Sequence, residues 1–409
     1  MCGSVTVDLV TLATGHKGSR YAADMTRHAG TIREAVAGKR VLVIGGAGSI
    51  GSATMRALLT FAPSAVHVVD QDENGLAELV RDVRSAGLTP PALDLRLLPL
   101  DYGAPVAHRF ISDAGPYDVA LHFAALKHVR SEKDPASVLQ MLDTNVLKQV
   151  RLMTWLAAAG PPARYFAVST DKAANPVNFM GASKRLMEHA LFTDAVTPLG
   201  TAMRTSARFA NVAFSAGSLL ESWGERLRKR QPVAVPRDTR RYFVSVEEAA
   251  EICLLALAAV PDRHLAIPLM RAESDLHELV PIAEAFVKAA GFRAAWFDDE
   301  PEARGAVERE RARGAWPVLR TSRDTDGEKA QEEFVGAGET AIDIGLQALR
   351  GVEQRGVDAS TLQAVLDELG LWIAQPRIRA DKDAIGEVIA RAVPEFRPAR
   401  GGKGLDDRM

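Results

Sequence analysis

Val41-Leu-Val-Ile-Gly-Gly-Ala-Gly-Ser-Ile-Gly51 joins a short apolar segment to regularly spaced glycines. The apolar residues predict a buried strand, and an apolar helix is expected from Ser49 to about Phe61. Glycines in this setting let the backbone approach a pyrophosphate, and the helix N-terminus offers N–H donors to it. A glycine-rich turn without a ligand is the alternative, which the flanking strand and helix disfavour. The residues predicted to contact a dinucleotide are Gly45, Gly48, Ser49, Ile50 and Gly51.

Acidic residues follow the next two predicted strands. Ala65 to Val69 is expected to be a strand that ends in Asp70, about 20 residues beyond the last glycine. A carboxylate at this place binds the ribose hydroxyls of NAD and repels the 2′-phosphate of NADP, so the pattern predicts NAD as the cofactor. The third strand, Leu93 to Leu100, ends in Asp101. Asp101 either reaches the adenine amino group or lies in a surface turn.

The fourth predicted strand, Tyr117 to Phe123, runs into two small residues, Ala124 and Ala125. Small side chains at a strand end allow a cofactor to lie close to the backbone. Lys127 and His128 follow them and would face whatever lies beyond the cofactor.

The next apolar strand ends in a hydroxyl, an acid and a base, which are Thr170, Asp171 and Lys172. An Asn-Pro turn follows, and then a helix that carries Met180 and Lys184. Proton-transfer groups at the end of a strand occupy the usual place for chemistry in an open parallel sheet. A polar loop with a solvated Asp–Lys pair is the alternative interpretation, and the glycine pattern upstream argues against it.

A long helix is expected from Asp134 to about Ala159, because Asp is a favourable N-cap and Pro135 suits the first helical position. Asn145 lies inside this helix. It is either a core residue with satisfied hydrogen bonds or a residue that orders the active site through water.

Strands and helices alternate from residue 40 to residue 210, which predicts an α/β fold with a Rossmann-type doubly wound parallel sheet. We expect a helical N-terminal extension over 1–38 and the NAD-binding domain over 39–210. A smaller substrate-binding region is expected over 211–291, and a helical C-terminal appendage over 292–409. The helices expected in this appendage are Glu302–Arg313, Thr340–Glu353, Ser360–Leu369 and Lys382–Arg391.

The composition is that of a globular protein: 409 residues, of which 47% are hydrophobic and 25% charged. The net charge of −2 gives no indication of a nucleic-acid partner. The two cysteines, Cys2 and Cys253, offer no disulfide framework or zinc site, and no metal is predicted. No run approaches the roughly 18 apolar residues of a membrane span. Charged residues interrupt the N-terminus, so no signal peptide and a cytoplasmic location are expected.

Several motifs together resemble the extended short-chain dehydrogenase/reductases. The similarity is greatest to the polysaccharide-biosynthesis group that contains UDP-N-acetylglucosamine 4,6-dehydratases, and it covers roughly residues 38–285. The motifs that carry it are Gly45–Gly51, Ala124–Val129, Thr144-Asn-Val146, Ser169-Thr-Asp-Lys-Ala173, Met180-Gly-Ala-Ser-Lys-Arg185, Arg208-Phe-Ala-Asn-Val212 and Arg241-Tyr-Phe243.

The resemblance implies a nucleotide-sugar 4,6-dehydratase with NAD as cofactor. Such an enzyme oxidises the sugar at C4, eliminates water across C5 and C6, and returns the hydride to C6. It also implies Asp171 as acid and Lys172 as base, with acid–base groups of this kind contributing about 10²–10⁴-fold each. Thr170 would hydrogen-bond the 4-hydroxyl group, and Lys184 would bind the nicotinamide ribose.

The resemblance further implies a UDP-linked sugar as ligand, and helices 135–159 and 178–192 that pair in a homodimer or larger homo-oligomer. Two positions depart from the family pattern. Met180 stands where a catalytic Tyr is usual, and a thioether cannot act as a base. Ala216 replaces an expected arginine in Ser215-Ala-Gly-Ser218. The residues expected to bind the nucleotide-sugar are Lys127, His128, Asn211, Ser218 and Arg241.

Two other functions stay open at this point. An NAD-dependent nucleotide-sugar 4-epimerase or ketoreductase would normally need the Tyr that Met180 replaces, and would not need Asp171 and Lys172. A catalytically inactive NAD-binding structural or regulatory protein would account for Met180, but not for the retention of Thr170, Asp171, Lys172 and Lys184.

Overall fold

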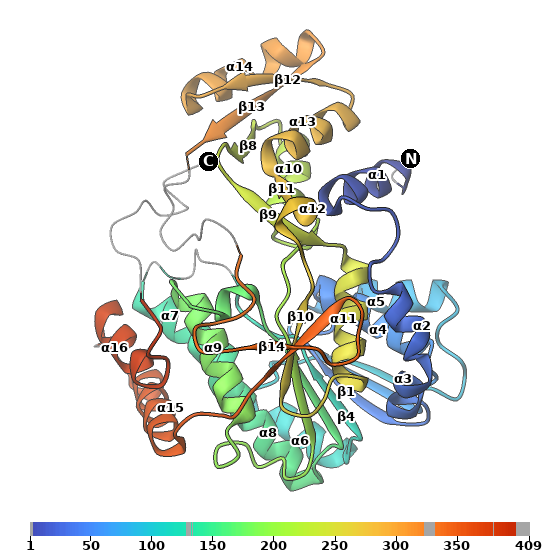
Figure 1. Cartoon of the computed structure of the whole chain (residues 1–409), viewed down its shortest axis with the longest axis vertical. Helices are drawn as coiled ribbons and strands as arrows, with labels where there is room; N and C mark the ends of the chain where they lie inside the picture. Colours follow the sequence, from blue (N-terminus) through green and yellow to red (C-terminus); the bar gives the residue numbers. More distant parts are fainter. Residues whose placement is uncertain (1–2, 128–131, 133, 323–331, 379, 398–409) are drawn as a thin grey trace.

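The computed structural model describes residues 3–127, 132, 134–322, 332–378 and 380–397. A nine-stranded sheet forms the larger part of the molecule, in the order β14-β15-β10-β6-β5-β4-β1-β2-β3 (Figure 1). The run from β10 to β3 is parallel, and the strand order reverses between β1 and β4, as in a doubly wound fold. The predicted fold class is confirmed. The parallel strands are β1 (Arg40–Ile44), β2 (Ala65–Asp70), β3 (Asp94–Pro99), β4 (Val119–His122), β5 (Arg164–Val168), β6 (Met203–Ala207) and β10 (His264–Pro268).

Each face of this sheet has its own hydrophobic core, because side chains alternate along a strand. In β1, Val41 and Val43 belong to one core, whereas Leu42 and Ile44 belong to the other. The helices of the first core are α2 (Ala22–Arg27), α3 (Ala29–Val36), α4 (Ser49–Leu59), α5 (Glu73–Ser85) and α11 (Val246–Ala258). Those of the second are α6 (Pro105–Ala114), α7 (Pro135–Leu142), α8 (Lys148–Ala159) and α9 (Phe179–Phe192).

The long helix predicted from residue 134 to residue 159 is present as α7 and α8, joined by a π-helical turn, Asp143–Leu147. The Asp134 side chain caps it, as predicted, by accepting hydrogen bonds from the first-turn N–H groups. Asn145 is fully buried in the π-helical turn. Its amide exchanges two hydrogen bonds with the backbone of Leu126 and donates a third to Ser183, at 2.8–2.9 Å. The interpretation as a satisfied core residue is therefore confirmed.

A second, smaller lobe lies above the carboxyl ends of the strands and contains two three-stranded sheets (Figure 1). One sheet has the order β11-β9-β7 and the other β12-β13-β8. Its strands are β7 (Asn211–Val212), β8 (Val233–Pro236), β9 (Arg240–Val244), β11 (Leu276–Glu278), β12 (Arg293–Phe297) and β13 (Ala315–Thr321). Its helices are α10 (Leu219–Arg228), α12 (Ala272–Asp275), α13 (Leu279–Ala289) and α14 (Glu300–Ala312), and α1 (Gly3–Thr14) packs against α13.

The region after residue 292 is less helical than predicted. Strand β12 pairs with β13, which in turn pairs with β8, and the helix predicted at Thr340–Glu353 is wrong. This segment forms β14 (Ala341–Ile342) and β15 (Leu349–Glu353), and β15 pairs antiparallel with β10. Gly345 lies at φ 80°, outside the helical region, and Gly351 weakens helix propensity further. Because β10 would otherwise be an open sheet edge, pairing with β15 satisfies its backbone groups.

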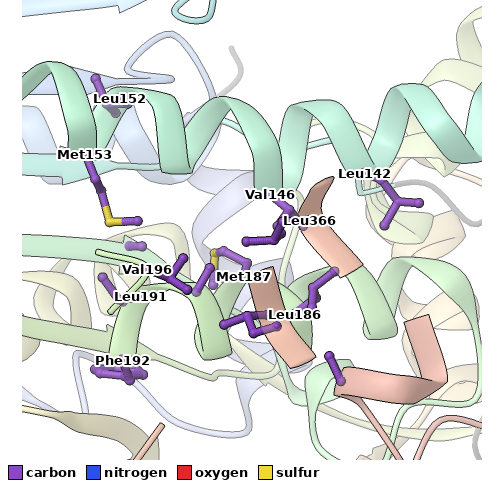
Figure 2. Close-up of a cluster of buried hydrophobic side chains, with 14 of the residues drawn as sticks. Leu142, Val146, Leu152, Met153, Leu186, Met187, Leu191, Phe192, Val196 and Leu366 are labelled. Carbon is purple, nitrogen blue, oxygen red and sulfur yellow. The ribbon is translucent and has the colours of Figure 1, made fainter. Parts of the chain in front are cut away.

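The last two predicted helices are present as α15 (Ala359–Ala374) and α16 (Lys382–Ala392). They pack against α7 and α9, and every residue of α9 is buried. Leu366 of α15 belongs to the same buried cluster as Val146 and Leu186 (Figure 2). The chain's own helices therefore cover part of the face through which a homodimer was expected, namely α7 and α9. The homo-oligomer stays a prediction.

A cluster of buried charges ties α9 to the C-terminal segment. The fully buried Arg208 guanidinium donates to both oxygens of Glu188, at 2.8 and 2.6 Å, and to Glu339 at 2.6 Å. Arg185 also donates to Glu339, at 2.6 Å. Burial alone would lower the pKa of Arg208, but the two carboxylates more than compensate and hold it above its usual value.

Leu366→Ala is expected to lower the free energy of unfolding by about 2–5 kcal/mol, because it opens a cavity where α15 meets α7 and α9. Leu371→Ala is the matched control: the same helix and the same substitution, but a side chain that is 65% exposed, so an effect within about 0.5 kcal/mol is expected. Urea unfolding of both variants measures the difference. Equal losses in the two variants would contradict the packing described for α15.

Candidate active site and cofactor cleft

A pocket of about 640 Å³ lies between the carboxyl ends of the central strands and the smaller lobe. The glycine loop after β1 lines one part of it, and the residues that follow β5 line another. Side chains of β7, β9 and α10 close it from the smaller lobe. The predicted site residues that line the pocket are Gly45, Gly48, Ser49, Ile50, Gly51, Ala125, Lys127, Thr170, Asp171, Lys172, Met180, Lys184, Asn211, Ser218 and Arg241.

The glycine loop is packed too tightly for side chains at two of its positions. Gly45 has φ 79°, and a Cβ there would collide with the backbone of Ala124. A Cβ on Gly51 would collide with the Gly45 carbonyl oxygen. At Gly48, in contrast, the nearest atom to an added Cβ would be 3.7 Å away. Gly48 also precedes the first turn of α4, so the exposed backbone and the helix N-terminus form a cradle that fits a pyrophosphate.

Three predicted cofactor residues, Ala124, Asp70 and Asp101, are not among the described residues that line the pocket. Ala124 supports Gly45 through its backbone. The Asp70 carboxylate accepts hydrogen bonds from the N–H groups of Ala47 and Asp72, at 2.9 and 3.0 Å, so it also holds the glycine loop in place. Asp101 forms an ion pair with the buried Lys148 at 2.6 Å.

The three polar residues after β5 converge on one carboxylate oxygen. Thr170 Oγ1 donates to Asp171 Oδ1 at 2.7 Å, and Lys172 Nζ lies 3.4 Å from the same oxygen. The Asp171 side chain is only 4% exposed, whereas that of Lys172 is 36% exposed. A buried acid and a more accessible base therefore share one hydrogen-bonded unit at the pocket wall. Met180, which is 4% exposed, lines the same pocket.

Lys184 is a buried cation at the floor of the pocket. Its ammonium group donates to the Val168 carbonyl at 2.9 Å. Burial lowers the pKa of Lys184 to about 8, although the nearby Glu188 carboxylate works in the opposite direction. Because the pKa lies close to neutral pH, Lys184 can carry a proton or receive one under ordinary conditions.

The first turn of α9 is fixed by a residue that the sequence patterns did not identify. Glu132 accepts hydrogen bonds from the N–H groups of Phe179 and Met180, at 3.0 and 2.9 Å. At the next position, a Cβ on Gly181 would collide with the Lys172 carbonyl oxygen. The helix that carries Met180 and Lys184 is therefore packed directly on the Asp–Lys loop.

The predicted substrate residues gather at the side of the pocket nearest the smaller lobe. Asn211 Nδ2 donates to Glu332 at 2.6 Å, and Arg241 Nε lies 3.3 Å from the same oxygen. Lys127 Nζ donates to the Ala216 carbonyl at 2.6 Å. Ser218 accepts a hydrogen bond from an N–H group in the first turn of α10. His128 lies outside the described residues.

Glu332 is the second site residue that sequence reasoning missed, since it stands far from every recognised motif. In the part of the chain that the structure describes, no group of three or more His, Cys, Asp and Glu side chains could hold a metal ion. In the same part of the chain, no helix is both long and apolar enough to span a membrane.

Residues 41–341 match the family described as polysaccharide biosynthesis protein. An uncharacterized membrane protein of Methanocaldococcus jannaschii is 34% identical over 53% of this chain and 62% of its own length. A Campylobacter jejuni UDP-N-acetylglucosamine 4,6-dehydratase (inverting) is 26% identical over 60% of this chain and 72% of its own. A UDP-glucose 4-epimerase of Rickettsia felis is 27% identical over 53% of this chain and 62% of its own length. The matched part of this chain spans only 62%, 42% and 36% of the lengths of three of its curated relatives.

Solved structures share the fold at low sequence identity. Pen from Bacillus thuringiensis superposes with a TM-score of 0.61 at 20% sequence identity. The match covers 78% of this chain and 91% of the Pen chain. Bordetella bronchiseptica WbmF, in complex with NAD+ and UDP, gives a TM-score of 0.50 at 18% identity, over 62% of this chain and 77% of its own. These likenesses establish the Rossmann-type architecture.

Two glycine substitutions are expected to separate folding from dinucleotide binding. Gly51→Ala should lower both stability and NAD+ affinity, because the new Cβ collides with the Gly45 carbonyl. Gly48→Ala should leave the melting temperature nearly unchanged, because its Cβ has room in the protein alone. It should still weaken NAD+ binding about tenfold or more, since a pyrophosphate must approach this backbone closely. Thermal unfolding and NAD+ titration measure the two effects. Wild-type NAD+ affinity in Gly48→Ala would contradict the assigned cradle.

Proposed function

The chain belongs to the polysaccharide biosynthesis protein family, within the extended short-chain dehydrogenases/reductases, and we propose that it is an NAD-dependent nucleotide-sugar 4,6-dehydratase. The proposed substrate resembles UDP-N-acetylglucosamine. The family contains both dehydratases and epimerases, so the site residues must decide between the two reactions.

The observation that carries the proposal is the buried Asp171 carboxylate in contact with the Lys172 ammonium group. Elimination of water needs a base for the C5 proton and an acid for the departing hydroxyl. A 4-epimerase needs neither group, but it does need a base at the position that Met180 occupies. A thioether cannot accept that proton. The Asp–Lys pair and Met180 therefore both favour the dehydratase.

NAD is the cofactor. The Gly45, Gly48 and Gly51 cradle fits a dinucleotide, and Lys184, which lines the same pocket, is proposed to bind the nicotinamide ribose. When bound, NAD+ accepts and returns a hydride, which is redox chemistry that the protein's own side chains lack.

The contact between Asp171 and Lys172 accounts for how one pair supplies both an acid and a base. Transfer of a proton from Lys172 Nζ to Asp171 Oδ1 converts the ion pair into a neutral amine and a carboxylic acid. The amine then takes the C5 proton, and the acid protonates the 6-hydroxyl as it leaves as water. The pair returns to its charged form, so the elimination step itself needs no further proton donor. C5 regains a proton when the hydride adds to C6, and Lys172 is proposed to supply it. The proton released from the sugar 4-hydroxyl in the oxidation then restores the pair.

The first step also releases a proton, from the sugar 4-hydroxyl. Thr170 is proposed to hydrogen-bond this hydroxyl, since its own hydroxyl lines the pocket next to Asp171. Lys184 is the proposed acceptor, because its pKa of about 8 leaves part of it neutral near that pH. Met180 then serves only as part of the apolar pocket wall.

Incubation with UDP-N-acetylglucosamine and NAD+, followed by mass spectrometry, tests the reaction. A product that has lost the mass of one water supports the dehydratase. An unchanged mass with a new sugar configuration would show an epimerase. Absence of a reaction with all nucleotide-sugars offered would show a protein that binds its cofactor without catalysis.

Three variants are expected to separate the acid from the base. Lys172→Ala should abolish exchange of the C5 proton with solvent deuterium and lower dehydration by about 10²–10⁴-fold. Asp171→Asn should block loss of water while some exchange remains, because the base acts before the acid. Met180→Ala is the control at the same pocket wall and should have a mild effect. Deuterium incorporation and product formation are followed by mass spectrometry. Near wild-type dehydration by Lys172→Ala would contradict the mechanism.

A further inference from the structure

A buried carboxylate lies beside two of the side chains expected to bind the nucleotide-sugar, one of which, Arg241, would pair with its diphosphate. Glu332 is 9% exposed and lines the pocket. One of its oxygens accepts the Asn211 amide at 2.6 Å and lies 3.3 Å from Arg241 Nε. The other accepts the Tyr242 N–H at 3.4 Å. Two of the expected nucleotide-sugar residues, Asn211 and Arg241, are therefore engaged by the protein's own anion.

The segment that follows Glu332 is anchored firmly. The Phe334 ring lies 5.8 Å from that of Tyr242, and the Phe334 carbonyl accepts a hydrogen bond from Arg208 at 3.0 Å. Farther along, Glu339 is held by Arg208 and Arg185. Because these contacts fix the backbone just beyond Glu332, its carboxylate is presented to Arg241 in a defined position and is not a freely moving surface charge.

The charges around Glu332 show that it lies close to the catalytic pair as well. Burial raises the pKa of the Glu332 carboxyl, Arg241 lowers it, and the negative charge of Asp171 raises it again. A diphosphate at Arg241 would add negative charge beside this carboxylate. Like charges at such short range repel strongly in a partly buried site.

On the basis of the proposed function, we propose that Glu332 is a specificity-determining residue of the nucleotide-sugar site: its carboxylate and the ligand's diphosphate compete for Arg241 and Asn211. A ligand must then gain enough binding energy from its nucleoside and sugar to displace Glu332. Small anions that offer only phosphate groups lack this energy and are excluded. Glu332 thus sets an affinity threshold at the arginine, which phosphate or pyrophosphate alone does not reach and a complete nucleotide-sugar does.

Titration calorimetry of the full chain with UDP, and separately with inorganic pyrophosphate, tests this competition. Glu332→Gln keeps the shape of the side chain but removes its charge, and it should bind both probes about tenfold more tightly than the wild type. Glu333→Gln is the matched control: the adjacent glutamate contacts Asn175 at 3.0 Å and does not line the pocket, so the same change in net charge should leave both affinities unchanged. NAD+ affinity should be equal in all three proteins, which verifies that they are folded.

Each outcome decides the proposal. Tighter binding of UDP and pyrophosphate by Glu332→Gln alone supports it. Unchanged or weaker binding overturns it, as does an equal gain in Glu333→Gln, which would reflect overall charge. Failure of all three proteins to bind either probe also overturns it. A gain in Glu332→Gln without turnover of UDP-N-acetylglucosamine would uphold the role of Glu332 and count against the dehydratase. Turnover of UDP-N-acetylglucosamine with unchanged affinity of Glu332→Gln for UDP and pyrophosphate would support the dehydratase and overturn the role of Glu332.

Discussion

The buried guanidinium of Arg208 must be matched by carboxylates, and the arrangement of three distant segments follows from this need. A charge removed from water costs several kcal/mol unless it is paired and hydrogen-bonded. Arg208, at the end of β6, meets Glu188 of α9 and Glu339 of the C-terminal segment. Arg185 compensates the second carboxylate. The sheet, the catalytic helix and the segment that leads into β14 are thereby joined at one point next to the pocket.

The same cluster reaches the proposed catalytic residues. Glu188 also accepts a hydrogen bond from Ser169 at 2.6 Å, immediately before the Thr-Asp-Lys sequence. Its negative charge acts on Lys184, one helical turn earlier, and limits how far burial lowers the pKa of that lysine. Glu132 fixes the start of the same helix by binding the N–H groups of its first turn. The proposed acid, the proposed base and the buried lysine are therefore held on a rigid support, as the proposed acid–base catalysis would require.

The C-terminal part of the chain completes both the sheet and the site. Strand β15 closes the open edge at β10, and α15 and α16 cover α7 and α9. These contacts bury apolar side chains of α7 and α9 within a single chain. Glu332, which precedes β14, contributes to the wall of the pocket. A region without recognisable motif chemistry thus shapes both the core and the binding site.

Local patterns in the sequence determined the Rossmann-type half of this protein. The glycine spacing, the apolar strands and the Asp134 cap depend on neighbouring residues, so they could be recognised without knowing the fold. The pocket residues Thr170, Asp171 and Lys172 follow a strand end, and Lys184 lies in the helix after them, so they were found in the same way. Only the tertiary structure decided that residues 340–353 form strands, that α15 and α16 cover α7 and α9, and that Glu332 meets Arg241. Each of these depends on a partner far away in the chain: an open sheet edge, an apolar helix face or an arginine of the smaller lobe. Short-range periodicity contains no information about such partners.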